Sequence, residues 1–502
     1  MRRFLKIVAG LLVTVVVLAF IAVFAITNSN WGREQLRTRA VAALNGAAHG
    51  IVKIGAIDGN LLRGLTLRDV SITDSAGAPF VTASEIRTGY AIRPFISRKI
   101  ELSDVVFVNP VVVLDRRQGE FWNYERIFPT DSLSPKSDTA GVQFGDWVVL
   151  HDVRMINGHL TVRVPWSPPD SVSARVRDSV ITAALDSSSR TKVIAVAGGY
   201  QLVQEFREIF GKLPLARVAH PDHKTRLFVA DSLRLIALAF APPAAVVRQM
   251  RGEFEVDSDS VWFTAPDLQL PASQLSVSGR YTLDNGDMAL KVMAKPVSLN
   301  DVRFLYPALP GDGTANFDLA LKWVGPKQQY LFRGLDLKMG TATARGELGL
   351  TVADTLELHQ TDVTFAGIST SLIEQLVPAI DVPRRGILSG RAKIDGALTS
   401  MQVDGDVTFN DTQSGANRVL AVGEIGTADG VLRARNLRVT LRPVQVDLIR
   451  ISVKDFPLGG TISGTATLNG ATDTRLTATR FDLTHLESGE RSRFTGTGAI
   501  RL

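Results

Sequence analysis

Most of the chain after residue 50 alternates between apolar and polar positions, the two-residue period of a β-strand with one buried face. In GILSGRAKIDGAL (386–398), the even positions carry only Leu, Gly, Ala and Ile, whereas the odd positions include Arg, Lys and Asp. Successive side chains of a strand point to opposite faces. The pattern therefore predicts a sheet that is apolar on one side and hydrated on the other.

The same phrase returns later in the chain. GTISGTATLNGAT (460–472) is identical to 386–398 at six of thirteen positions, and GTANFDLAL (313–321) matches 390–398 in part. The copies recur at intervals of 77 and 74 residues. That period is longer than the 20–50 residues of most repeat proteins, so each repeat is expected to contain several antiparallel strands.

The apolar side of these strands carries unusually small side chains. It is rich in Gly and Ala, and aromatic residues make up only 7% of the chain. A sandwich would cover this side with a second sheet and large branched or aromatic side chains. Glycine in strands instead permits bends. Two architectures remain possible at this point. One is a sandwich, and the other is a sheet that curls around its own apolar face and leaves an open groove.

The first residues follow a different pattern. Arg2, Arg3 and Lys6 precede 7–26, twenty residues without a charge, which is enough for a helix to cross a bilayer. A cleaved signal peptide is the alternative, but its apolar region is shorter and ends in small residues. We expect a membrane anchor with the basic end in the cytoplasm and residues 27–502 across the membrane. The anchor residues are Ile7, Leu11, Leu12, Val16, Phe20, Phe24 and Ile26.

Short helices are predicted at 28–48, 122–128 and 201–210. The first is expected to begin at a cap formed by Ser29 or Asn30. Its Trp31 fits either a membrane-interface aromatic or a buried helix residue.

Turns are predicted at Asp74–Gly77 and Asn109–Pro110. A bulge is predicted at the Asp69–Val70 step, because the alternation changes parity between Leu67 and Val70.

The resulting division of the chain is a series of five segments. They are an anchor (1–27), a juxtamembrane helix (28–48), an N-terminal β module (49–129), an irregular insertion with a short helix (130–225) and a repeating β region (226–502).

Charge and motifs exclude several function classes. The net charge of +6 is spread along the chain, without the clustered basic and aromatic residues of a nucleic-acid binder. No cysteine is present, so disulfides and cysteine metal sites are impossible. His220 and His223 flank Pro-Asp and fit a loop better than a metal site, and Ser189–Lys192 lacks the partner motifs of an acyl enzyme. We expect no enzyme activity, no cofactor and no metal.

Three stretches carry a resemblance to a known family. Residues 55–119 (GAIDGNLLRGLTLRDVSITD and onward), LQLPASQLSVSGRYTL (268–283) and the two glycine-marked phrases resemble the TamB/AsmA-like envelope proteins. The resemblance covers about 1–120 and 250–502, whereas 130–225 departs from it.

This resemblance implies a fold class: mostly β, with an N-terminal transmembrane helix and then an elongated, curved antiparallel sheet, the repeating β-groove. It also implies an inner-membrane protein in the bacterial periplasm that moves phospholipids between the inner and outer membranes. An outer-membrane β-barrel of the Omp85 type is an implied partner, and the chain is expected to be a fragment of a longer protein.

The groove is expected to be lined by apolar-face residues. In the repeats these are Leu388, Ile394, Leu398, Ile462 and Leu468. In the N-terminal module, where a closed core is an equal alternative, they are Leu65, Leu67, Val70, Ile72, Ile86, Tyr90 and Ile92.

Two other functions remain as alternatives. The first is a translocation and assembly factor for outer-membrane β-barrel proteins, whose sheet edge would pair with client strands. The second is a purely structural tether, which would need no continuous apolar lining.

Overall fold

The computed structural model describes residues 29–500, except 61–63, 91–96, 98, 129–146, 169–171, 187–191, 239–241, 258, 284, 354, 378–380, 429 and 450–457. The predicted anchor at 7–26 and the predicted lining residue Ile92 lie outside the described residues. Within them, no helix has the length and apolarity needed to cross a membrane.

The described chain is mostly β and divides into two compact units between Leu268 and Gln269. Unit 1 contains α2 (Asn30–Ala47), β1 (Gly50–Lys53), β2 (Ala56–Asn60), β3 (Gly64–Asp74), β4 (Pro79–Tyr90), β5 (Ile100–Val108), β6 (Val111–Asp115), α4 (Asn123–Ile127), β7 (Val148–Trp166), α5 (Ala174–Leu185), β8 (Val193–Val196), β9 (Gly199–Ala219), β10 (Arg226–Ala237), β11 (Ala245–Val256) and most of β12 (Ser260–Gln269).

Unit 2 is built almost entirely of strands, with three short helical segments. It contains β13 (Gln274–Thr282), β14 (Met288–Ser298), η1 (Leu299–Val302), β15 (Thr314–Val324), β16 (Lys327–Met339), β17 (Ala342–Val352), β18 (Leu356–Ser369), α6 (Thr370–Leu376), β19 (Gly386–Ala397), β20 (Ser400–Asp411), β21 (Gly415–Ala428), β22 (Val431–Gln445), α7 (Val446–Ile449), β23 (Thr461–Ala471), β24 (Arg475–Glu487) and β25 (Glu490–Ile500).

The sheet of unit 1 is mixed, not purely antiparallel as expected. β5 and β6 both run parallel to β7. β4 pairs antiparallel with β5 and with β6. The predicted turn at Asn109–Pro110 is therefore wrong, because the chain continues in the same direction. Asn109 adopts φ 47° and donates its backbone N–H to Ile156 O at 2.9 Å, so this step only interrupts one long strand.

The predicted helix at 201–210 is also wrong, because these residues belong to β9, which pairs with β7, β8 and β10. Glu208 has φ 51°. A left-handed residue of this kind shifts the parity of a strand, so Phe206 and Ile209 acquire a spacing that resembles a helical one.

The stretch 130–225 is less irregular than expected, since β7, β8 and β9 take up much of it. The boundary between the two units also lies at 268/269, beyond the expected 225/226.

Two local predictions in unit 1 are confirmed. α2 begins after Ser29, whose hydroxyl accepts a hydrogen bond from Gly32 N at 3.0 Å, and the short helix expected at 122–128 is α4. The bulge predicted before Val70 is wrong: Asp69 has φ 50° and no register partner on β4, but the register of β3 against β4 is the same on both sides of it. Trp31 is 65% exposed, so its interpretation as a buried helix residue is wrong.

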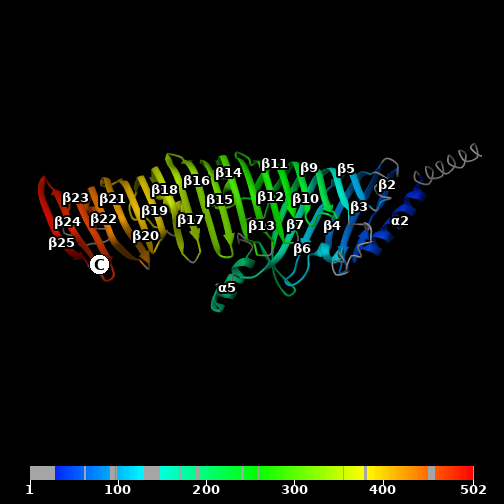
Figure 1. Ribbon diagram of the computed structural model, residues 1–502, viewed down its shortest axis with the longest axis horizontal. Helices are drawn as coiled ribbons and strands as arrows, with labels where there is room; N and C mark the ends of the chain where they lie inside the picture. Colours follow the sequence, from blue (N-terminus) through cyan, green and yellow to red (C-terminus); the bar gives the residue numbers. More distant parts are fainter. Residues whose placement is uncertain are drawn as a thin grey trace, which may run out of the picture. The chain divides into compact units, whose positions relative to one another are not determined.

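Unit 2 is an antiparallel meander. Every strand from β13 to β25 pairs with the next one along the chain, and in Figure 1 these strands lie side by side from green to red. Period-two strands joined by short turns favour this topology.

The sequence repeat corresponds to four strands. Its three copies form β15, β19 and β23, the first strand after each long connection. The described parts of these connections, which we call the crossing segments, are residues 299–313, 370–377 with 381–385, and 446–449 with 458–460. They join the strands at one edge, the connection edge, and the opposite edge has only short turns. The repeat therefore consists of four strands and one crossing segment.

Four strands of unit 2 carry bulges at left-handed residues. β16, β18, β22 and β24 each contain such a residue, with φ between 47° and 58°, and each has register shifts against both neighbours. These residues are Gly334, Gln360, Asn436 and Arg480, whereas β20 pairs with both neighbours without a shift. A bulge bends its strand and increases local twist, so the sheet gains curvature at these four strands.

Candidate functional site

The strand register places the apolar residues of unit 2 on one common face. Directly opposed residues in a ladder point to the same side, and Gly346, Val363, Ala392, Gly405, Ala421, Val439 and Ala466 form an unbroken series of such pairs from β17 to β23. We call this side the apolar face and the other side the polar face. The row consists only of Gly, Ala and Val. Across seven strands these small side chains project little from the sheet, and we call this row the low floor.

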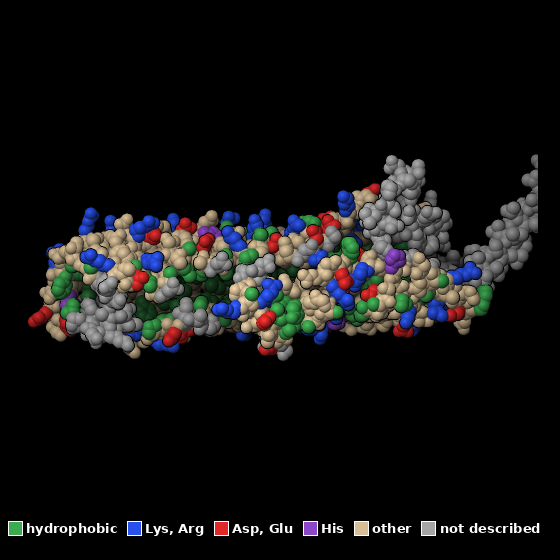
Figure 2. All heavy atoms as spheres, turned by 90° about the horizontal axis from the view of Figure 1, so that it is seen from below, with side chains coloured by type: hydrophobic (Ala, Val, Ile, Leu, Met, Phe, Trp, Pro, Cys, Tyr) green, Lys and Arg blue, Asp and Glu red, His purple; other side chains and the backbone are tan. Residues whose placement is uncertain are grey.

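The apolar face is only half-buried. Val363, Phe365, Ile394, Val403, Val407 and Val419 all retain partial exposure, whereas side chains in a closed core would be buried. The main helix contacts on these strands are those of η1 with β14, α6 with β18 and β19, and α7 with β22. Figure 2 shows a hollow over the C-terminal strands with hydrophobic side chains inside it. A half-buried apolar surface of this extent is typical of a binding surface.

Ion pairs between neighbouring strands cover the polar face. Arg391 Nη2 lies 3.0 Å from Asp362 Oδ2, and Arg418 Nη2 lies 2.6 Å from Asp406 Oδ2. The hydrogen bond from each arginine holds the pKa of its carboxyl below the usual value. These exposed pairs add little stability individually, but they keep the polar face charged and hydrated.

The crossing segments cover the connection edge of the apolar face. Leu299, Met339 and Ala342 are buried there against Leu337, Ile368, Leu372 and Leu376. The segments also bond to one another, since Tyr306 Oη donates to Leu376 O and Arg384 Nη2 donates to Asp447 O at 3.3 Å. This edge is therefore partly closed by a continuous series of contacts.

A buried carboxylate ties one of these segments, through Arg384, to the turn between β20 and β21. Asp411, 4% exposed, accepts hydrogen bonds from the Ser414 hydroxyl and Gln413 N, and its Oδ2 lies 3.7 Å from Arg384 Nη1. Burial raises the pKa of Asp411, but these hydrogen bonds and the guanidinium outweigh burial and hold the pKa below its usual value.

This carboxylate makes the connection edge acid-sensitive. A lowered pKa in the folded state means that Asp411 stabilises the fold above its unfolded pKa of about 3.9 and loses this contribution as pH falls through the lower folded pKa. Asp411→Asn is expected to reduce unfolding free energy by about 2 kcal/mol near neutral pH. Denaturant titrations should show this difference unchanged from pH 8 to 5 and shrinking below about pH 4. A pH-independent difference would contradict the assignment of the charge.

The predicted lining residues of the repeats lie together on the apolar face, as expected. Ile394 pairs with Val403, Val403 with Gly423, and Leu437 with Leu468, so Ile394 and Leu468 lie in one row, separated by four strand steps or about 19 Å. Leu388 and Ile462 lie on the same face, and Ile462 is buried at 8% exposure. Leu398 follows β19 in the turn, half-buried. That these residues line a lipid path stays a prediction.

The predicted lining residues of unit 1 lie in a more closed setting. Ile86 packs on a cluster formed by buried Val105, Val153 and Ala216, and Val70 is 7% exposed. Leu65, Leu67 and Ile72 are half-buried. Tyr90 ends β4. Around Ile86 the structure thus resembles a core more than an open surface.

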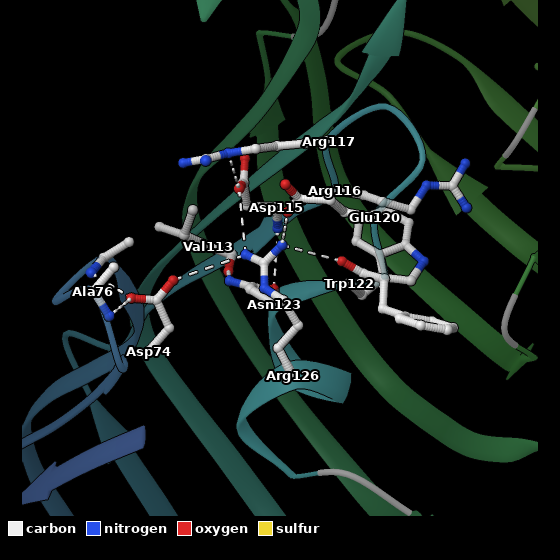
Figure 3. A network of polar contacts seen from close by, with 12 residues as sticks. Asp74, Ala76, Val113, Asp115, Arg116, Arg117, Glu120, Trp122, Asn123 and Arg126 are labelled. Carbon is white, nitrogen blue, oxygen red and sulfur yellow. Dashed lines mark hydrogen bonds and ion pairs between the residues drawn. The ribbon is translucent and has the colours of Figure 1, made fainter. Parts of the chain in front are cut away.

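The densest polar network of unit 1 surrounds Arg126 on α4 (Figure 3). Its guanidinium lies 2.5 Å from Glu120 Oε2, 3.8 Å from Asp74 Oδ2 and 4.0 Å from Asp115 Oδ2. Asn123 Nδ2 donates to Val113 O at 2.6 Å and ties α4 to β6. Because Arg126 bridges three carboxylates, and Arg117 Nε lies 3.9 Å from Asp115 Oδ2, the network clamps α4 in place and offers no obvious acid–base pair.

The two other motifs noted in the sequence, His220–His223 and Ser189–Lys192, include side chains that make contacts within the fold. His220 and His223 face each other across a single β-bridge, and the centroids of the His220 and Trp147 rings lie 4.0 Å apart with the rings tilted by 46°. Lys192 Nζ donates to Glu205 Oε1 at 2.7 Å. Within the described residues, no group of three or more His, Asp or Glu side chains has the arrangement of a metal site.

Comparison of the chain with protein-family models, with curated proteins and with solved structures finds no match. The function is therefore inferred from the geometry of the apolar face.

Two parts of this site were not predicted from sequence: the crossing segments over the connection edge and an aromatic pair, Phe317 and Phe332, on the apolar face. The segments lack periodicity, so no pattern indicated them. A position-by-position alignment of the three repeats would have shown the first aromatic, because Phe317 aligns with Ile394 and Leu468.

Proposed function

We propose that this protein is a conduit for phospholipids, anchored in the bacterial inner membrane by residues 7–26 and extending into the periplasm. The apolar face of unit 2 forms the wall of a groove that holds acyl chains, while head groups stay in water. The protein is non-enzymatic in this proposal and acts by carrying lipid between the inner and outer membranes. An Omp85-type barrel is the proposed outer-membrane partner.

The observation that carries this proposal is the half-buried apolar face running over successive strands. Acyl chains gain about 25 cal/mol for each Å² of apolar surface removed from water. Side chains of Leu, Ile, Val, Ala and Gly provide such a surface without polar groups that would select one head group. A tether would not need the unbroken row from Gly346 to Ala466.

Curvature supports the same function. The bulges on β16, β18, β22 and β24 bend the sheet, and the crossing segments cover one edge. The other edge, with its short turns, provides an opening along which a head group can stay hydrated.

Photo-crosslinking on the full chain in bacterial cells tests this proposal directly. The photoreactive residue p-benzoylphenylalanine replaces Val419 in one variant and Val422 in another. These two valines lie on the same strand, β21, but Val419 belongs to the apolar face and Val422 is 51% exposed on the polar face. Cells are labelled with radioactive phosphate before irradiation.

The variant at Val419 is expected to form a labelled phospholipid adduct, at least about tenfold more than the variant at Val422. Equal labelling at both positions, or none at Val419 in a protein that folds, would refute the conduit. A protein adduct at Val419 in place of a lipid adduct would favour the assembly-factor alternative.

A further inference from the structure

Unit 2 concentrates aromatic side chains on one hairpin. β15 and β16 carry Phe317, Trp323, Tyr330 and Phe332 on the apolar face, where register pairs join Leu319 to Phe332 and Leu321 to Tyr330. The rings of Phe317 and Phe332 meet edge to face with centroids 5.2 Å apart, and those of Trp323 and Tyr330 lie 6.3 Å apart. Such contacts hold each ring in a defined position.

The low floor of the groove ends at this hairpin. The row from Ala466 back to Gly346 continues to Leu335 on β16, which pairs with Gly346 and is 8% exposed. Next to Leu335 stand Phe317 and Phe332, both half-buried. The surface therefore rises from small side chains to aromatic rings within two strands.

Comparison of the three repeats shows that the larger apolar side chains on β15 are specific to the first copy. Aligned by their glycines, Phe317 corresponds to Ile394 and Leu468, and Leu319 corresponds to Gly396 and Gly470. Two apolar-face positions on one strand are thus larger in the first repeat than in the other two. The fold itself does not require the larger residues, since β19 and β23 form without them.

We propose that Phe317 and Phe332 form a constriction across the groove that admits unbranched hydrocarbon chains and excludes chains bearing methyl branches. This inference rests on the proposed function and adds a selection step to it. A straight methylene chain can lie flat along the two rings. A methyl branch must displace a ring that its aromatic partner holds in place, and a misfit of one methyl group lowers binding by about tenfold or more.

The test compares two photoreactive fatty acids, palmitic acid and the methyl-branched phytanic acid, each carrying the same diazirine and alkyne groups. The full chain is reconstituted in nanodiscs of dimyristoylphosphatidylcholine and irradiated with each probe. Labelled peptides from β14–β16 and from β19–β21 are quantified separately, so that the second region normalises the first.

Palmitic acid is expected to label both regions of the wild type. Phytanic acid is expected to label β19–β21 but to label β14–β16 at least about tenfold less. In the double variant Phe317→Ile, Phe332→Leu, this deficit should shrink to about threefold or less. Phe409→Leu, which removes an apolar-face ring on β20 away from the hairpin, should leave the deficit unchanged.

A reciprocal variant covers the case in which the double variant does not fold. Ile394→Phe places a ring at the equivalent position of the second repeat and is expected to lower phytanic acid labelling of β19–β20 by about fivefold. Equal relative labelling by the two probes in the wild type would overturn the constriction while leaving the groove intact. Labelling of neither region by palmitic acid would overturn the proposed function, and this inference with it.

Discussion

Aspartate at both Ile394 and Leu468 is expected to empty the groove of lipid. Both residues are half-buried on the apolar face and lie in one row that crosses five strands, β19 to β23. A carboxylate there must stay hydrated, because burying it against acyl chains is far more costly than leaving it in water. In a protein with the crosslinker at Val419, Ile394→Asp with Leu468→Asp should reduce the phospholipid adduct by about tenfold or more.

The chain offers a matched control for this variant. Ile387 and Leu486 are also apolar and lie on β19 and β24, but they are 45% and 47% exposed on the polar face. Ile387→Asp with Leu486→Asp adds the same two charges and should leave the adduct within about twofold of the parent level. If both double variants lose lipid equally, the loss reflects unfolding or net charge, and the apolar face is not the lipid site.

Alanine at Gly464 is expected to cause a large loss of stability in unit 2. This glycine has φ 132°, and a Cβ atom added to it would lie 2.0 Å from Asp482 O on the neighbouring strand. Neither the dihedral angle nor the space suits a side chain. Gly464→Ala should therefore lower the free energy of unfolding by about 3 kcal/mol or more, measured by denaturant titration.

Gly405 provides the control for this glycine. It lies on the same face, between Ala392 and Ala421, but a Cβ atom there would meet its nearest neighbour, Arg391 O, at an ordinary 3.7 Å. Gly405→Ala should change stability by less than about 1 kcal/mol, and in the stabilising direction if it restricts the unfolded chain. A similar loss for both variants would mean that the backbone at Gly464 is not constrained as described.

The two-residue alternation was sufficient to predict most of the strands and the face on which each apolar residue lies. It predicted Ile394 and Leu468 on one side and Arg391 and Lys393 on the other, because the period of a strand maps directly onto its two faces. The capped helix after Ser29 and the short helix at 122–128 were also predicted, since local signals determine both.

The errors have a common physical origin in backbone conformation. Glu208 changes the parity of β9 and makes a strand look helical, and Asn109 with Pro110 looks like a turn although the strand continues. Gln360, Asn436 and Arg480 adopt left-handed conformations with no glycine to indicate them. Periodicity also carries no information on strand direction, so the parallel pairing of β5 and β6 with β7 was not foreseen.

The four-strand repeat constrains how this chain can change in length. Because four is an even number, successive crossing segments lie at the same edge of the sheet, and each repeat presents its apolar residues to the same side. Loss or duplication of a whole repeat of about 75 residues would preserve the face and the edge. Loss of a single strand would move the next crossing segment to the opposite edge. Evolution can therefore adjust the reach of such a protein in steps of about 19 Å without redesigning its cross-section.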